Sequence, residues 1–293
     1  MMRSGLGRLS YGFLAAALWT VTPTTQAMSA TAFETAKQTG TVTVGLANEK
    51  PYAYIETDGK VTGAIVEVLR AALEPLGITK IEANVNEFSA LVPGVMAGRF
   101  DIIGAGMYVT PKRCESIAFT NPLTQIATVL ATHAGNPGNI HSLEDIAKSS
   151  TLKVGSQLGT AQVDDLHRAG IPDDRIVLFT RDTEGFSGLQ AGRVDAIYYP
   201  ALEISELIAK TGAKDVERVE PFTIAKGTDG KPLLNFQSLG LRKEDTDFIE
   251  ALNKQISALR ASGKLAEILK PFGFSAQDLP ADGVTAAAIC SGS

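Results

Sequence analysis

Histidine, cysteine and tryptophan are scarce in this chain of 293 residues, which contains three, two and one of them, respectively. The histidines, His133, His141 and His167, lack the spacing of a metal site, so we expect no metal centre. The chain also lacks a cluster of lysine and arginine, and its net charge is −5, which argues against a nucleic-acid partner. No P-loop, Gly-x-Ser-x-Gly or His-Glu-x-x-His motif occurs, so nothing in the sequence indicates an enzyme or a cofactor.

Long apolar segments are also missing, apart from one near the N-terminus. There, Arg3 and Arg8 precede the apolar residues 13–19, and residues 25–27 (Thr-Gln-Ala) offer a small-residue cleavage site. This order is typical of a secretory signal peptide, and the apolar run is shorter than the roughly 20 residues of a membrane span. We therefore expect residues 1–27 to be removed during export. An uncleaved membrane anchor is the alternative.

The two cysteines are Cys114 and Cys290. In an oxidising compartment an even number of cysteines is interpreted first as a disulfide, and two free thiols are the alternative. A bond between them would connect the C-terminal tail to Cys114, which directly follows Arg113. Because it would close a very long loop, its nominal stabilisation is about 4–5 kcal/mol, which is an upper figure.

From Gly40 onward, the chain alternates between strand and helix patterns. Short apolar strands are expected at residues 41–46, 81–85 and 101–104. Between the first two, apolar residues recur at helical spacing from Ile65 to Leu76 and end at Gly77. This strand–helix–strand order predicts a parallel sheet.

A weak internal repeat indicates two lobes. Residues 91–103 resemble residues 186–197, because each segment contains a short helix, an Ala-Gly-Arg-x-Asp turn and an apolar strand. Chance similarity of a common helix–turn–strand unit is the alternative. The predicted fold is α/β and two-lobed, each lobe a mainly parallel sheet flanked by helices, with two crossover segments as hinges. The first lobe is predicted to comprise residues 40–131 and 237–293, and the second residues 132–236.

Aromatic residues are concentrated where the predicted strands end, although they make up only 6% of the chain. Ligands of open α/β sheets bind beyond the C-terminal ends of the strands. The aromatic residues in these segments are Tyr52, Phe88, Tyr108, Tyr198 and Tyr199, accompanied by Glu49 and Glu87. An aromatic cage beside an arginine suits a zwitterion with a diffuse or alkylated positive charge. Burial in the lobe cores is the alternative interpretation of any one of these rings.

Arg113 is the arginine nearest to this group. Thr110 and Pro111 predict a helix that begins just before it, with a hydroxyl N-cap and proline at the first position. A planar guanidinium at a helix start beyond a strand suits a carboxylate. The alternative is a surface arginine paired with Glu115 or another neighbour.

Residues 40–275 resemble the amino-acid-type periplasmic solute-binding proteins of ABC importers (solute-binding protein family 3). The stretches that carry the resemblance are LANEKPYAYI, NEFSALVPGVMAGRFDII, TPKRC and the tail KPFGFSA with its late Cys290. Within that family they are most similar to ectoine- and hydroxyectoine-binding proteins. The resemblance implies a monomeric periplasmic protein that has no cofactor, binds a compatible solute for osmoprotection and delivers it to an inner-membrane ABC permease.

The resemblance also implies roles for individual residues of the first lobe. Arg113 is expected to bind the ligand carboxylate, and Glu49 to form hydrogen bonds with the ring nitrogens. The expected cage around the cationic ring consists of Tyr52, Phe88 and Tyr108.

In the second lobe, backbone N–H groups near Gly159 and Thr160 are expected to meet the carboxylate. Tyr199 is also expected to bind the ligand, and it stands at the position where general amino-acid receptors carry an aspartate for the α-ammonium group. A site without that carboxylate should discriminate against ordinary α-amino acids. A receptor for a polar amino acid is the first alternative function. A periplasmic dehydratase on the same fold, with Glu49 as general acid, is the second.

Overall fold

The computed structural model describes residues 1, 30–224 and 234–292. Almost all of the predicted signal peptide therefore lies outside the described residues. Residues Thr31–Ser293 form one compact unit, separate from Met1–Ala30, and the fold described below is that of the larger unit. Within the described part of the chain, no helix is both long and apolar enough to cross a membrane.

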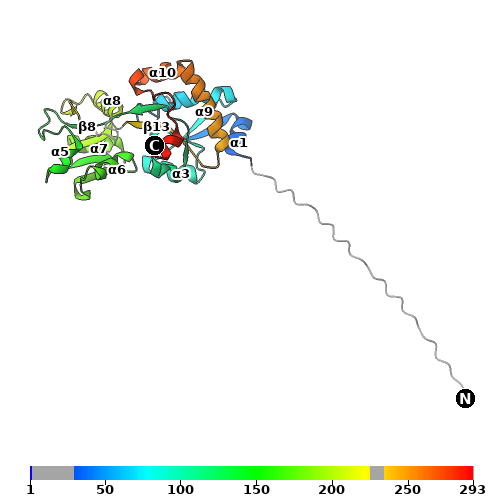
Figure 1. Ribbon diagram of the computed structural model, residues 1–293, viewed down its shortest axis with the longest axis horizontal. Coiled ribbons are helices and arrows are strands. Elements are labelled where there is room, and N and C mark those ends of the chain that lie inside the picture. The colour runs from blue at the N-terminus through cyan, green and yellow to red at the C-terminus, as the bar shows by residue number, and fades with distance from the viewer. Residues whose placement is uncertain (2–29, 225–233, 293) are drawn as a thin grey trace. The chain divides into compact units, whose positions relative to one another are not determined.

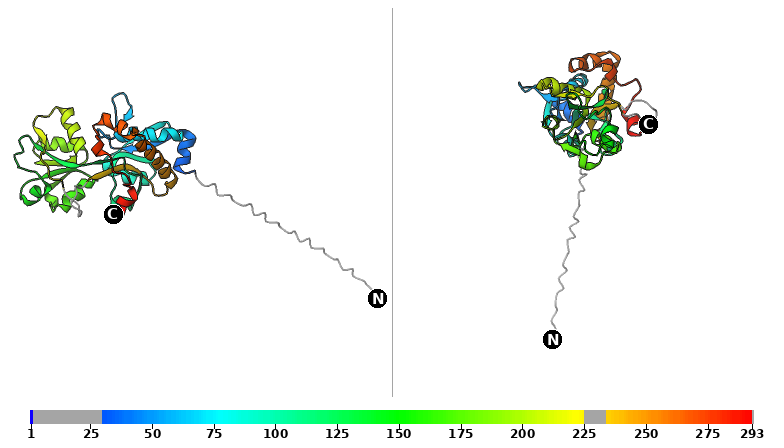
Figure 2. Two further views of the ribbon diagram at one scale, coloured as in Figure 1. Left: turned by 45° about the horizontal axis from the view of Figure 1, so that its top comes forward. Right: turned by 90° about the vertical axis from the view of Figure 1, so that its left-hand side faces the viewer.

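The first sheet has six strands in the order β4-β1-β5-β13-β6, with β7 paired to β13. Figures 1 and 2 show the ribbon of the chain, with β13 labelled in Figure 1. These strands are β1 (Thr41–Leu46), β4 (Lys80–Val85), β5 (Ile102–Tyr108), β6 (Ala118–Phe119), β7 (Thr124–Ile126) and β13 (Asn235–Leu241). Strand β1 is parallel to β4 and β5, whereas β13 is antiparallel to β5, β6 and β7. A short hairpin, β2 (Tyr54–Ile55) and β3 (Val61–Thr62), stands apart from this sheet.

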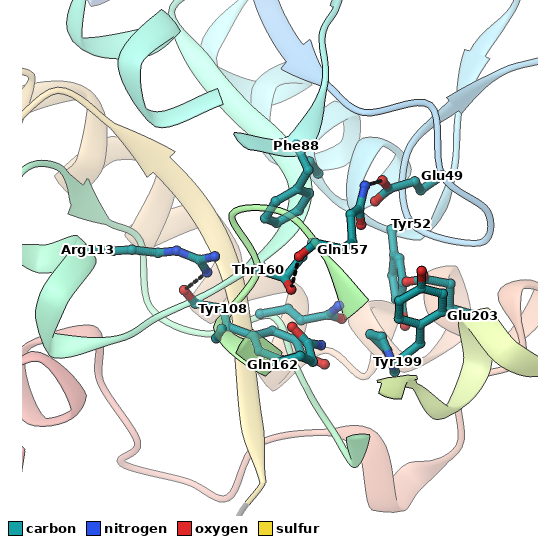
Figure 3. Close-up of a pocket in the computed structure, with 15 residues that line it drawn as sticks. Glu49, Tyr52, Phe88, Tyr108, Arg113, Gln157, Thr160, Gln162, Tyr199 and Glu203 are labelled. Carbon is teal, nitrogen blue, oxygen red and sulfur yellow. Dashed lines mark hydrogen bonds between the residues drawn. The ribbon is translucent and has the colours of Figure 1, made fainter. Parts of the chain in front are cut away.

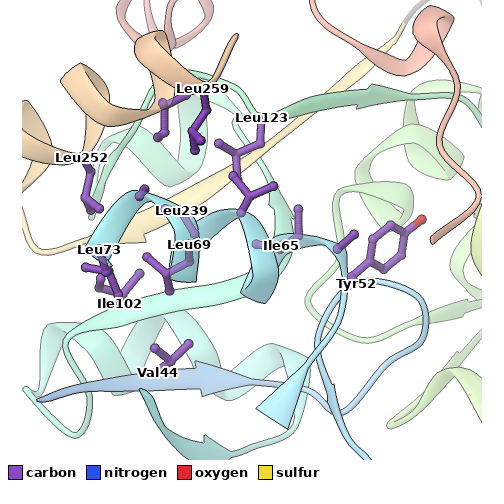
Figure 4. Packing of buried hydrophobic residues seen from close by; sticks show 14 of the residues in the cluster. Val44, Tyr52, Ile65, Leu69, Leu73, Ile102, Leu123, Leu239, Leu252 and Leu259 are labelled. Carbon is purple, nitrogen blue, oxygen red and sulfur yellow. The ribbon is translucent and has the colours of Figure 1, made fainter. Parts of the chain in front are cut away.

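Two helices pack against the first sheet and contribute many of the buried residues of its core. In α2 (Ala64–Leu73), Ile65, Leu69 and Leu73 recur every four residues and are fully buried. They pack in one cluster with Leu252 and Leu259 of α9 (Thr246–Ala261), as Figure 4 shows. The other helices that accompany this sheet are α1 (Ala32–Thr39), α3 (Leu91–Met96), α4 (Pro111–Cys114), α10 (Lys264–Leu269) and α11 (Ala286–Cys290). The apolar spacing that begins at Ile65 thus predicts helix α2 and the face that it buries.

The second sheet has five strands in the order β10-β9-β11-β8-β12. They are β8 (Thr128–His133), β9 (Val154–Gln157), β10 (Ile176–Phe179), β11 (Ala196–Pro200) and β12 (Val216–Arg218). Its helices are α5 (Leu143–Lys148), α6 (Ala161–Arg168), α7 (Asp182–Gln190) and α8 (Ala201–Thr211). Single 3₁₀ turns occur at Glu74–Leu76, Phe88–Ala90, Asp173–Arg175, Lys270–Phe272 and Ala276–Asp278.

The chain passes from the first sheet to the second at Ala127, between β7 and β8, and β13 brings it back. In each sheet one strand runs against the others, namely β13 in the first and β8 in the second. We propose that the two sheets with their helices are the two lobes. The first crossing is then the segment around Ala127, and β13 belongs to the first lobe.

The two copies of the Ala-Gly-Arg-x-Asp turn have the same structural role. Gly98 and Gly192 adopt positive φ angles of 67° and 70°, which end the preceding helices. The carboxylate of Asp101 accepts hydrogen bonds from the backbone N–H of Thr43 and from its hydroxyl. The carboxylate of Asp195 likewise accepts from the N–H of Lys153, just before β9. Each aspartate therefore fastens its strand to the neighbouring parallel strand.

One predicted strand end is wrong in a way that concerns the site. The sequence predicts a strand that stops at Gly104, but β5 continues to Tyr108. The reason is tertiary, because Met107 and Tyr108 pair with Ser238 and Gln237 of β13. Tyr108 is therefore held in a sheet rather than in a loop.

Candidate functional site

A pocket of about 370 Å³ lies among residues of both sheets (Figure 3). It is lined by Glu49, Tyr52, Phe88, Ala105, Gly106, Tyr108, Arg113, Gln157, Thr160, Ala161, Gln162, Tyr199, Pro200, Glu203 and Gln237. Seven of the eight predicted ligand-binding residues are in this set. The eighth, Gly159, does not line the pocket, although its carbonyl contacts Arg113.

Arg113 lies where the sequence predicts a helix start. Helix α4 begins at Pro111, and the hydroxyl of Thr110 accepts a hydrogen bond from the backbone N–H of Arg113. The guanidinium donates to the carbonyl oxygens of Tyr108 and Gly159, at 2.8 and 2.9 Å. It also lies 5.6 Å from the ring centroid of Phe88, within cation–π range.

The charge of Arg113 is left without an acidic partner. Within the described part of the chain it forms no ion pair, so the predicted alternative of a pair with Glu115 is not what the structure shows. Loss of contact with water lowers the pKa of the guanidinium to about 10, and Asp164 and Tyr108 oppose this shift. The group therefore remains cationic at neutral pH and retains N–H groups for an anionic ligand.

The predicted aromatic residues divide between the pocket and the core. Tyr52, Phe88 and Tyr108 are buried and line the pocket, and the Tyr108 hydroxyl lies 3.4 Å from that of Thr128 at the start of β8. Tyr199 also lines the pocket, whereas its neighbour Tyr198 packs in the core of the second sheet. Successive residues of a strand point to opposite faces, so only one of these two tyrosines can face the site.

Glu49 links the two sheets. It follows β1, is 6% exposed, and its Oε1 accepts a 2.6 Å hydrogen bond from Nε2 of Gln157 at the end of β9. Burial and the nearby Asp182 raise the pKa of Glu49 to about 8, and the hydrogen bond from Gln157 opposes the shift. A cation that entered the pocket would favour the ionised carboxylate, since opposite charges stabilise one another.

Several polar pocket residues were not predicted from the sequence, namely Gln157, Gln162, Glu203 and Gln237. Gln237 lies in β13, where its Oε1 accepts from the Thr124 hydroxyl at 2.7 Å. Glu203 belongs to the first turn of α8, directly after the strand end that carries Tyr199. The rule that ligands bind beyond strand ends could have found Glu203 if it had been applied to the following helical turn.

Gly106 explains how Tyr52 comes so close to β5. Gly106 has a φ of +66°, and a Cβ atom there would lie 2.9 Å from Nε2 of Gln237 and 3.1 Å from the Tyr52 ring. Only glycine satisfies both the backbone conformation and the available space.

The predicted disulfide is present. Cys114 in α4 is bonded to Cys290 in α11, across 176 positions of sequence. The bond fastens the C-terminal helix to the element that carries Arg113.

Residues 42–275 match the model of the bacterial extracellular solute-binding proteins, family 3. The chain belongs to this family. The family resemblance that the sequence indicated is thereby confirmed, as is the α/β fold of the type II periplasmic binding proteins.

Two relatives and one solved structure are similar to this solute-binding protein over most of its length. It is 31% identical to a probable amino-acid ABC transporter periplasmic-binding protein, y4tE, of Sinorhizobium fredii, over 87% of this chain and 84% of the relative. It is 25% identical to the L-arginine-binding protein of Pseudomonas aeruginosa, over 74% of this chain and 82% of the relative. A crystal structure of EhuB in complex with hydroxyectoine matches with a TM-score of 0.80 and 32% identity, over 88% of this chain and 97% of that one.

Proposed function

We propose that this solute-binding protein binds a zwitterionic compatible solute, ectoine or hydroxyectoine, between its two lobes and delivers it to an ABC permease. The observation that carries the proposal is the pocket itself. It combines an arginine without an acidic partner among the described residues, two buried acidic side chains and four aromatic side chains.

The charges of such a ligand fit the two sides of the pocket. In Figure 3, Arg113 lies on one side, and Glu49 with Tyr52 lies on the other. A carboxylate beside Arg113 would gain charge-assisted hydrogen bonds. A cyclic amidinium beside Glu49 would gain a carboxylate acceptor and the faces of the aromatic rings, worth roughly 0.5–2 kcal/mol for each cation–π contact.

The similar proteins support this class of ligand. The structure of EhuB that resembles this chain contains hydroxyectoine, and the relatives named above are binding proteins of amino-acid transport. The same comparison favours a receptor that transports its ligand over an enzyme that converts it. Export to the periplasm by a cleaved N-terminal segment and a monomeric state are part of the proposal.

A receptor for a polar amino acid is the second candidate, and one observation favours it. Glu203 places another buried acidic side chain in the pocket, so a ligand with two cationic groups and one carboxylate would also be balanced. Arginine is such a ligand, and one of the relatives is an L-arginine-binding protein.

Isothermal titration calorimetry of the mature protein with ectoine, hydroxyectoine, glycine betaine, arginine and histidine tests the proposal. We expect ectoine or hydroxyectoine to bind at least about 100-fold more tightly than any amino acid, a difference of about 2.7 kcal/mol. Tight binding of arginine without measurable binding of ectoine would transfer the proposal to the second candidate.

Closure of the two lobes can be tested at Gly159. This residue has a φ of +83°, and a Cβ atom there would lie 2.7 Å from Cα of Ser89, which belongs to the first lobe. Gly159→Ala is therefore expected to weaken ligand binding by about tenfold or more, because the added Cβ would collide with Ser89 in the closed form.

Gly170→Ala is the matched control for this change. Gly170 has the same φ of +83°, but a Cβ atom there meets nothing within 4 Å. Both variants should lose similar stability from backbone strain, about 1 kcal/mol, and only Gly159→Ala should lose affinity. Equal affinities of the two variants would contradict the inferred closure at Ser89.

A further inference from the structure

Unsatisfied buried polar atoms are concentrated in residues that line the pocket. In the described residues, the buried side-chain atoms without a hydrogen-bond partner are Tyr52 Oη, Tyr199 Oη, Glu203 Oε1 and Asp245 Oδ2. Asp245 Oδ2 lies 2.9 Å from Nη2 of Arg242 and is thus part of an ion pair. The other three belong to residues that line the pocket. Burying such atoms unpaired is unfavourable, so a ligand that supplies hydrogen bonds would offset the cost.

Of these three residues, Glu203 is the strongest candidate for a hydrogen bond with the ligand. Its side chain is only 4% exposed, and it lies on the first turn of α8. Figure 3 places it beside neither Arg113 nor Phe88, but on the same side of the pocket as Glu49 and Tyr52. Burial, with Glu49 and Asp182 nearby, raises the pKa of Glu203 well above its ordinary value. Glu203 therefore holds its proton more tightly than an exposed glutamate does, and a cation beside it would favour the ionised carboxylate.

The free acceptor oxygens on this side of the pocket match the N–H donors of the proposed ligand in number. Oε1 of Glu49 already accepts from Gln157, which leaves Oε2 of Glu49 for a ligand. Oε1 of Glu203 has no partner. A protonated cyclic amidine carries two N–H donors, one on each ring nitrogen and both in the plane of the amidinium, whereas a quaternary ammonium carries none.

We propose that Glu203 is a second ligand-binding residue, whose Oε1 accepts one N–H of the cationic group while Glu49 accepts the other. This inference rests on the proposed function and names the feature that the site selects. The site then requires a cation with at least two N–H donors, and it rejects fully alkylated zwitterions such as glycine betaine. An alkylated ammonium would leave Glu203 Oε1 buried and unpaired, which lowers its affinity.

Glu203→Leu and Glu203→Gln, titrated with ectoine and with glycine betaine, test the proposal. Leucine removes the acceptor, so we expect ectoine to bind about tenfold or more weakly while betaine binds equally well or better. Glutamine retains an oxygen acceptor at this position, so we expect it to keep more of the ectoine affinity than leucine does. Glu206→Gln is the control, because Glu206 lies one turn further along α8 and does not line the pocket.

Thermal unfolding without ligand separates a ligand contact from a structural role. A buried carboxyl with an unpaired oxygen does not stabilise the empty protein, so the Tm of Glu203→Leu should equal or exceed that of the wild type. If ectoine binds the wild type and Glu203→Leu keeps the same ratio of ectoine to betaine affinity, the proposal for Glu203 is wrong and the proposed function stands. If ectoine does not bind the wild type, the proposed function fails first.

Discussion

Arg113→Ala should weaken the binding of a carboxylate ligand by about 100-fold or more. Removal of one partner from a desolvated charge pair costs about 2–5 kcal/mol, because the other charge is left buried and unpaired. The loss would be direct, since the guanidinium lines the pocket and forms no ion pair with a described residue. Calorimetric titration of the variant with the ligand that binds the wild type measures the effect.

Arg193→Ala is a matched control for the loss of Arg113. Both arginines lie over an aromatic ring, Arg113 over Phe88 at 5.6 Å and Arg193 over Phe179 at 5.2 Å. Only Arg113 lines the pocket, so only its loss should reduce affinity. Arg113→Lys should recover a small part of the binding, because an ammonium keeps the charge without the planar pair of donors. Wild-type affinity in Arg113→Ala would show that the carboxylate binds elsewhere.

The second large effect is expected on stability. Replacement of Cys114 and Cys290 together by serine should lower the free energy of unfolding by about 2–5 kcal/mol. The disulfide closes a segment of 176 positions, so its loss frees many conformations of the unfolded chain. For a chain of this size the decrease corresponds to a Tm that is lower by roughly 5–15 °C.

Thermal unfolding with and without dithiothreitol checks this prediction. The wild type should lose stability when the reductant is added, and the double serine variant should not respond. Ligand affinity should also fall in the variant, since Cys114 directly follows Arg113 in α4. An unchanged wild-type Tm after complete reduction, verified by thiol titration, would show that the bond contributes no stability.

Much of the fold could be predicted from the sequence, because the signals are local. Thr110 and Pro111 define the start of α4 by the hydroxyl and ring that they carry. The Ala-Gly-Arg-x-Asp turns contain within themselves the glycine and the carboxylate that form them. Strands of two or three residues, such as β6 and β12, were not predicted. They are too short to display the alternation of apolar and polar side chains that marks a strand.

The site was predicted in outline for a similar reason. Strand ends gather at one edge of a sheet, so Glu49, Tyr52 and Phe88 could be grouped without coordinates. The pairing of Cys114 with Cys290 needed only the count of two cysteines. The types of the residues, their short spacing in the sequence and the even number of cysteines were enough for these inferences.

Only the tertiary structure decided which polar atoms are satisfied. Glu49 and Gln157 are 108 positions apart in sequence, and their hydrogen bond exists because two sheets approach each other. That contact occupies one oxygen of Glu49, while the packing of α8 leaves Oε1 of Glu203 without a partner. A hydrogen bond between distant segments requires its two atoms to be placed within a few tenths of an ångström of the right separation. No local pattern of residues encodes that separation.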